Sequence, residues 1–273
     1  MTTERAAPLK LLVMADLHLR AERPLHGIDP ATSVTRALAH ARRHHPDAAA
    51  LLLLGDLVHD GTEADYRRLA ALLQDLPWPV HFLLGNHDGR AAFRTVFPEA
   101  PVDGAGFVQS VQPLGRHRLI LLDSLEDPAR LPRRHAGRLG PERLAFLAAA
   151  LDEADRAGAR LLVFVHHPAA AIGIAGIDAI GLVDADAFLA TLAPHRARID
   201  HLFFGHVHRA TTGTVSGLPF TTPASTTMQL PFQPPARGPA HDPQLPAGYV
   251  VALLPAVSGA PLVLHHEMLL PAG

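Results

Sequence analysis

Metal-ligating residue types follow five apolar stretches of this chain, each time at the point where the stretch ends. Asp and Asn supply oxygen and His supplies imidazole nitrogen, the donors that divalent cations prefer in proteins. Asp16 and His18 are two residues apart, as are His206 and His208, so both side chains of each pair lie on one side of an extended segment. The full set of candidate ligands is Asp16, His18, Asp56, Asn86, His166, His206 and His208.

Seven ligands are too many for one tetrahedral zinc ion. They suit two adjacent cations that share a carboxylate, an arrangement that clamps an in-line displacement at phosphorus. Asp56 is central in the set and is expected to bridge. Two divalent cations, two aspartates and a bridging hydroxide leave a net charge of about +1, which favours an anionic phosphate ester as substrate.

The alternative is structural. A lone His is often a core residue, and Asp after Gly is often a turn former or helix cap. This alternative explains single residues but not the set at five successive strand ends. His166, rather than its neighbour His167, is expected to be the ligand.

The apolar runs that precede the ligands are unbroken, which is typical of strands buried on both faces in a parallel sheet. The carboxyl ends of such strands meet at one edge, where ligands bind. We therefore expect one layered α/β domain spanning residues 1–273. Predicted strands are 9–15, 48–54, 79–84, 106–112, 117–123, 160–165 and 199–204, with a closing pair at 248–255 and 260–267; predicted helices are 32–45, 63–76, 89–97, 141–157 and 184–193.

Several helix ends have recognisable signals. Thr32 or Ser33 is the expected N-cap of the first helix, and Thr62 or Glu63 opens the second. Gly158 lies just past the end of the 141–157 helix. Between Pro231 and Pro246 there are six prolines, which block both helix and central strand. Residues 231–247 are therefore expected to form a surface segment or a cap.

The composition excludes several classes of protein. Hydrophobic residues make up 48% of the 273 residues and the net charge is −2, which predicts a folded chain and argues against nucleic-acid binding. Cys is absent, so disulfides and thiolate chemistry are excluded. No apolar run reaches about 18 residues, so no membrane span is expected. Residues 1–10 lack the apolar core of a signal peptide, which predicts a cytoplasmic location.

The blocks D-x-H, G-D, G-N-H-D, H and G-H-x-H occur in this order over residues 16–208 and resemble the calcineurin-like metallophosphoesterase superfamily. That resemblance implies a four-layer αββα sandwich instead of a single parallel sheet. Finer stretches are similar to the class III cyclic nucleotide phosphodiesterases and to bacterial glycerophosphodiesterases: DLHLR at 16–20, LHGID at 25–29, GNHDGR at 85–90, HHP at 166–168, IAGIDAIGL at 174–182 and GHVHR at 205–209.

The resemblance also implies roles for individual residues. His87 matches the histidine that stabilises charge on the phosphate or protonates the leaving oxygen, and Asn86 would polarise the non-bridging oxygens. Asp88 would either orient His87 or cap the 89–97 helix. The implied ligands of the first metal are Asp16, His18, Asp56 and His208; those of the second are Asp56, Asn86, His166 and His206.

Two positions depart from the family pattern. Ala169 follows Pro168 where relatives commonly have a second proline, and His59 stands where relatives vary among Asp, Asn and Gln. His59 would either hydrogen-bond His87 or lie exposed in a loop. Arg20, His26 and the 169–182 loop have no assigned role.

The expected activity is hydrolysis of a phosphodiester by a metal-bridging hydroxide. The expected substrate is a 3′,5′-cyclic nucleotide such as cyclic AMP, or a related small diester. Alternatives are a glycerophosphodiester, or a broader range of phosphomonoesters and phosphonates; a non-catalytic scaffold is a remote alternative. The ligands suit manganese or iron, with zinc or cobalt as alternatives. Homo-oligomerisation stays open.

Overall fold

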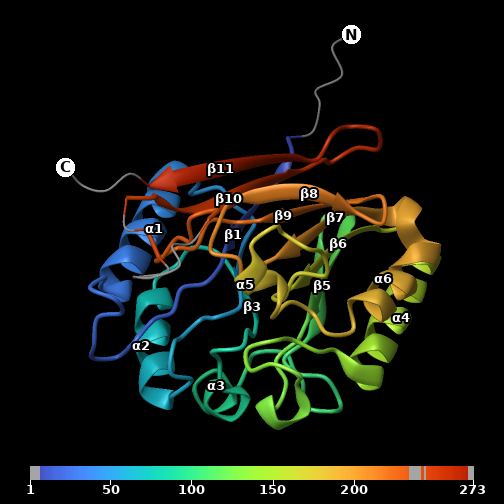
Figure 1. Ribbon diagram of the computed structural model, residues 1–273. Coiled ribbons are helices and arrows are strands. Elements are labelled where there is room, and N and C mark those ends of the chain that lie inside the picture. Colours follow the sequence, from blue (N-terminus) through green and yellow to red (C-terminus); the bar gives the residue numbers. More distant parts are fainter. Residues whose placement is uncertain (1–6, 234–240, 243, 270–273) are drawn as a thin grey trace.

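The computed structural model describes residues 7–233, 241–242 and 244–269. Two β-sheets pack face to face and carry helices on their outer faces, so the predicted four-layer αββα sandwich is confirmed (Figure 1). One sheet has the order β11 (Val263–Leu269), β10 (Ala247–Leu254), β1 (Leu9–Met14), β2 (Ala50–Leu54), β3 (Val80–Leu83). The other has the order β4 (Ser110–Leu114), β5 (His117–Leu122), β6 (Arg160–Val165), β7 (Ile199–Phe204), β9 (Leu218–Thr222), β8 (Thr211–Val215).

The layers explain why the strand sequences are apolar without alternation. On β1, Leu12 and Met14 belong to the core under the helices, whereas Leu11 and Val13 belong to the core between the sheets. Successive side chains of a strand point to opposite faces, and here both faces are buried. The residue pattern alone therefore predicted buried strands correctly but could not assign them to two sheets.

Helices cover the outer face of each sheet (Figure 1). Asp29, not Thr32 or Ser33, is the N-cap of the first helix: its side chain accepts from the Ala31 N–H, and Pro30 takes the first helical position. Thr62 caps the second helix in a capping box with Asp65. The helices are α1 (Pro30–His44), α2 (Glu63–Leu73), α3 (Arg90–Val96), α4 (Gly140–Ala157), α5 (Ala175–Asp178) and α6 (Ala185–Leu192), with 3₁₀ turns at Pro128–Arg130 and Ala193–Arg198.

Sequence patterning missed the β8–β9 hairpin. Its strands, TTGTV and LPFTT, are rich in threonine and contain a glycine and a proline, residues that weaken a strand prediction. The predicted closing pair is present as β10 and β11, which run antiparallel. Of the proline-rich segment 231–247, residues 234–240 and 243 lie outside the described part, and Ala247 already belongs to β10.

Across the described residues, the structure contains no helix that combines the length and the apolarity needed to cross a membrane.

Candidate dimetal centre

The seven candidate ligands all lie at the carboxyl ends of β1, β2, β3, β6 and β7. Five of them adopt a left-handed backbone, which is costly for residues other than glycine and concentrates at functional sites. Neighbouring strand ends hold this strained backbone in place: the Asp16 N–H donates to the Gly55 carbonyl at 3.1 Å, and the His18 N–H donates to the Asp56 carbonyl at 2.9 Å. The φ values are 54° for Asp16, 45° for His18, 47° for Asp56, 67° for His206 and 54° for His208.

Asp56 lies between two groups of imidazoles. Its Oδ2 is 3.5 Å from His18 Nε2 and 3.4 Å from His166 Nε2. On one side, His18 Nε2 and His208 Nε2 approach to 2.9 Å. Asp16 Oδ1 is 3.7 Å from His208 Nε2 and 4.0 Å from His166 Nε2. The structure therefore brings these residues together, with a carboxylate at the centre as a shared ligand requires.

Several buried polar atoms of this cluster have no hydrogen-bond partner among the residues that the structure describes: Asp16 Oδ2, Asn86 Oδ1, His166 Nε2 and His206 Nε2. An unsatisfied buried polar atom costs about 1–3 kcal/mol, so four at one place call for a ligand. Meanwhile His166 Nδ1 donates to the Leu54 carbonyl at 2.9 Å, and His208 Nδ1 donates to the Met228 carbonyl at 3.0 Å. These bonds place a proton on each Nδ1 and leave Nε2 as the nitrogen that can face a cation, as in metal sites. The donor set fits divalent cations.

Two glycines make room for the cluster. Gly55 has φ +80°, and a Cβ there would collide with the His166 ring. A Cβ on Gly85 would collide with the Asp56 carboxylate and lie 2.6 Å from His166 Nε2. A side chain at either position would displace a candidate ligand.

The charged groups of the cluster shift one another's pKa values. Burial by itself would lower the pKa of His166, but the nearby Asp56 carboxylate raises it to about 9. Burial opposes ionisation of Asp56, yet the His166 imidazolium holds the pKa of Asp56 well below its usual value. Burial lowers the pKa of His18 and of His206, so both are neutral and available as ligands. A cation bound beside Asp56 would take over the role of the His166 proton.

His87 lines a cavity of about 400 Å³ next to the cluster, together with Asn86. Its Nδ1 donates to the His59 carbonyl at 3.0 Å, and its ring lies between those of His59 and His135, with centroids 4.5 Å and 5.1 Å away. Asn86 Nδ2 donates to His135 Nδ1 at 3.0 Å. Sequence analysis missed His135, because it lies in a loop with no motif around it. A φ of 71° marks it as another strained residue of the site.

Neither role expected for Asp88 is present. Gly89 is the N-cap of α3 and no side chain caps that helix, and the His87 ring is held by the His59 carbonyl. The Asp88 carboxylate instead accepts four hydrogen bonds: from the N–H groups of Leu57, Val58 and Gly85, and from the Tyr66 hydroxyl. Burial, with a contribution from Asp56, raises its pKa to about 7. Asp88 thus joins the loops that carry Asp56 and Asn86.

The two neighbouring histidines are also placed by the structure. The His59 side chain is half-buried and its Nδ1 lies 3.2 Å from His18 Nδ1, so it neither hydrogen-bonds His87 through its ring nor lies free in solvent. His167 clusters with His166 and His206, but its Nδ1 is 2.7 Å from Ser124 Oγ and its Nε2 donates to the His135 carbonyl at 3.2 Å. Both its nitrogens are occupied, so His166 is the better placed ligand.

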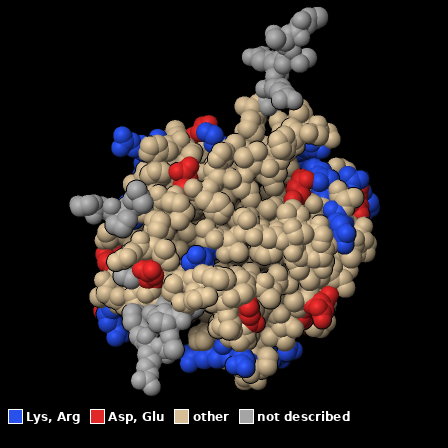
Figure 2. Space-filling model, turned by 45° about the horizontal axis from the view of Figure 1, so that its top comes forward, with Lys and Arg blue, Asp and Glu red and all other residues tan. Residues whose placement is uncertain are grey.

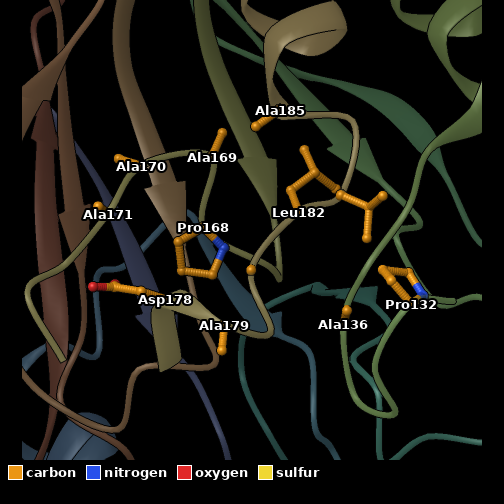
Figure 3. Close-up of a pocket in the computed structure, with 12 residues that line it drawn as sticks. Pro132, Ala136, Pro168, Ala169, Ala170, Ala171, Asp178, Ala179, Leu182 and Ala185 are labelled. Atoms are coloured by element: carbon orange, nitrogen blue, oxygen red, sulfur yellow. The ribbon is translucent and has the colours of Figure 1, made fainter. Parts of the chain in front are cut away.

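A second cavity, of about 380 Å³, is apolar and shares Ala136 with the first. In Figure 3, Pro132 and Ala136 come from one loop, while Pro168, Ala169 and Leu182 come from the segment after β6. Among the described residues that line it, Asp178 alone is charged, and the N–H groups of Ile172 and Gly173 already donate to its carboxylate.

Comparisons with known proteins agree with this geometry. Residues 9–210 match the family model described as calcineurin-like phosphoesterase. A probable cyclic nucleotide phosphodiesterase of Rhodopseudomonas palustris is 40% identical, over 84% of this chain and 82% of its own. A 3′,5′-cyclic adenosine monophosphate phosphodiesterase of Pseudomonas aeruginosa is 32% identical, over 74% of this chain and 71% of its own. A dimetal phosphatase from Danio rerio has a similar fold, with a TM-score of 0.71 at 16% identity and 96% of both chains covered. The chain belongs to the calcineurin-like phosphoesterase family, as the order of its five ligand blocks indicated.

Proposed function

We propose that this metal-dependent phosphodiester hydrolase acts on a 3′,5′-cyclic nucleotide, with cyclic AMP as the first candidate. The observation that supports two-metal hydrolysis is the position of Asp56 Oδ2, which lies about equally far from His18 Nε2 and His166 Nε2. The names of the two relatives support the substrate. So does the polar cavity beside the cluster: Arg134 lines it and can bind an anion, and the two carboxylates of the lining, Asp60 and Glu126, are already paired with Arg20 and Arg143.

We assign the ligands in two groups that share Asp56. Asp16, His18 and His208 hold the first cation with it, and Asn86, His166 and His206 hold the second. Two divalent cations lower the pKa of a water towards neutrality and stabilise negative charge on a phosphoryl group. Because Asp and His ligands accept several metals, availability decides among them, and manganese or iron is our proposal.

His87 acts on the leaving oxygen. Because its Nδ1–H is donated to the His59 carbonyl, Nε2 is the nitrogen that can carry a proton to that oxygen. Stacking between His59 and His135 holds the ring in place. Asn86 fixes His135 and, through its unpartnered Oδ1, contributes to the second cation. Asp88 acts indirectly, by holding the loops together.

We place the nucleobase in the apolar cavity, since the two cavities meet at Ala136. An apolar lining favours contact with the flat faces of a nucleobase, whereas the short polar glycerol of a glycerophosphodiester gains little from such contact. A glycerophosphodiester, or a broader range of phosphomonoesters and phosphonates, is the alternative substrate.

The test is to measure initial rates of manganese-loaded protein on 3′,5′-cyclic AMP and on glycerophosphocholine at matched concentrations. A ratio well above one supports the cyclic nucleotide, and the reverse ratio points to the glycerophosphodiester. Bis(p-nitrophenyl) phosphate serves as a control for the chemistry. If it is hydrolysed while both natural diesters are slow, the substrate proposal is wrong and the phosphodiester chemistry stands.

We propose a single domain over residues 1–273, a cytoplasmic location and a small-molecule substrate with no nucleic-acid or membrane partner. Basic and acidic side chains are interspersed on the face seen in Figure 2, which is in keeping with a net charge of −2. Sedimentation analysis tests whether the chain forms a homo-oligomer.

A further inference from the structure

His59 contacts two groups of the proposed site at once. Its Nδ1 lies 3.2 Å from His18 Nδ1, and its ring stacks on that of His87 at 4.5 Å with an interplanar angle of 25°. Its backbone carbonyl accepts from His87 Nδ1 at 3.0 Å. The His59 N–H donates to the Leu19 carbonyl at 3.0 Å, which ties this residue to the segment just after His18.

The direction of the hydrogen bond to His18 follows from the other nitrogen of that ring. His18 Nε2 points into the cluster, 3.5 Å from Asp56 Oδ2 and 2.9 Å from His208 Nε2. A neutral imidazole that offers one lone pair to a cation carries its proton on the other nitrogen. His18 Nδ1–H must therefore donate, and His59 Nδ1 must accept. His59 then carries its own proton on Nε2.

We propose that His59 is a positioning residue for two histidines of the site. Its side chain sets the tautomer and the ring orientation of His18. Its backbone carbonyl sets the tautomer of His87, and its ring face helps to hold the orientation of the His87 ring. This inference rests on the proposed dimetal function. The His59 ring contacts His87 only by stacking. The one side-chain hydrogen bond in this proposal is therefore the bond to His18, a proposed ligand of the first cation.

Two substitutions separate the side-chain contacts. His59→Phe keeps a flat ring against His87 but removes the acceptor for His18. His59→Asn keeps an amide oxygen that can accept but removes the ring. The backbone carbonyl, and with it the bond to His87 Nδ1, is present in both variants.

The measurements are zinc affinity by isothermal titration and the tautomer of His18 by ¹⁵N-detected NMR of the diamagnetic zinc protein. We expect His59→Phe to weaken zinc binding at the first position by about 10–100-fold, the usual effect of losing such an outer partner. The His18 Nδ1–H signal should shift or exchange faster. We expect His59→Asn to retain affinity close to that of the original protein, but to lose rate on diesters with poor leaving groups, where His87 matters most.

His265→Phe, on the exposed strand β11, is the matched control and should change neither quantity. If His59→Phe binds zinc with unchanged affinity and leaves the His18 signal in place, the inference is wrong. Asp56→Asn distinguishes this failure from a failure of the proposed function. Loss of zinc binding in Asp56→Asn with no effect of His59→Phe overturns only the role of His59, whereas unchanged binding in both overturns the dimetal site itself.

Discussion

Tyr66 is expected to hold the two central loops of the site together, although neither of its hydrogen bonds is to a proposed ligand. Its hydroxyl donates to Asp88 Oδ1 at 2.8 Å and accepts from the Gly89 N–H at 2.9 Å. Its ring is fully buried and packs edge-on against Phe93. Tyr66→Phe therefore removes one oxygen and two hydrogen bonds while preserving the packing.

The cost can be worked from these contacts. Because the pKa of Asp88 is about 7, the measurement is made well above pH 7, where the carboxyl is ionised and a hydrogen bond to it contributes about 1.5–3 kcal/mol. Asp88 keeps its three backbone donors, and Gly89 is only half-buried, so its N–H can recover part of its bond from water. We expect the free energy of unfolding to fall by about 2–3 kcal/mol. With a denaturant dependence of about 3 kcal/mol per molar urea, the midpoint would move down by roughly 0.7–1 M.

The assay is urea unfolding of the metal-free protein, followed by a zinc titration of the folded variant. Zinc should bind more weakly, because Asp88 fixes the backbone next to Asp56 and Asn86. The chain has one other tyrosine, Tyr249, whose hydroxyl makes one hydrogen bond within the described part of the chain, with His40 Nδ1 at 2.8 Å. Tyr249→Phe should cost about 0.5–1.5 kcal/mol and leave zinc binding unchanged. If Tyr66→Phe is no more damaging than Tyr249→Phe in both measurements, the reasoning about Asp88 is refuted.

Three further predictions concern the chemistry. Asp56→Asn should lose its bound metal, measured by mass spectrometry, and more than about 100-fold of its activity on bis(p-nitrophenyl) phosphate, since a loss of up to about 100-fold is typical of residues that only hydrogen-bond a metal ligand. A variant with full metal content and full rate would contradict the bridging assignment. His87→Ala should keep its metal and lose about 10²–10⁴-fold in rate, most with poor leaving groups, and equal losses on good and poor leaving groups would argue against an acid role. The His166 pKa of about 9 means that the metal-free protein holds a second proton on this ring at pH 7, and metal loading at pH 7 should displace it. NMR of the His166 ring nitrogens before and after zinc loading measures that loss, and a ring that is already neutral in the metal-free protein at pH 7 would contradict it.

The residue pattern was sufficient to predict the strands that carry the candidate ligands and the strand ends at which these ligands lie. Unbroken apolar runs such as 50–54 predict strands buried on both faces, and a polar residue just after such a run must lie at the sheet edge. The division into two sheets came from the family resemblance. The run at β2 and the run at β6 look alike locally, and nothing in either records which sheet it joins. The β8–β9 hairpin was missed because its strands contain a glycine and a proline and no unbroken apolar run.

The sequence by itself thus determined the kinds of ligand, their order and the strand ends that carry them, because these depend on residue type and local periodicity. Only the tertiary structure decided which atoms meet: His18 with His208 across 190 residues, Asp88 with Tyr66 across 22, and His135 with Asn86 across 49. It also replaced both expected roles of Asp88, and it showed that His59 bonds His87 through its backbone carbonyl while its side chain contacts His18. Such contacts depend on how loops from different strands fold over one another, and no spacing within a single segment encodes that arrangement.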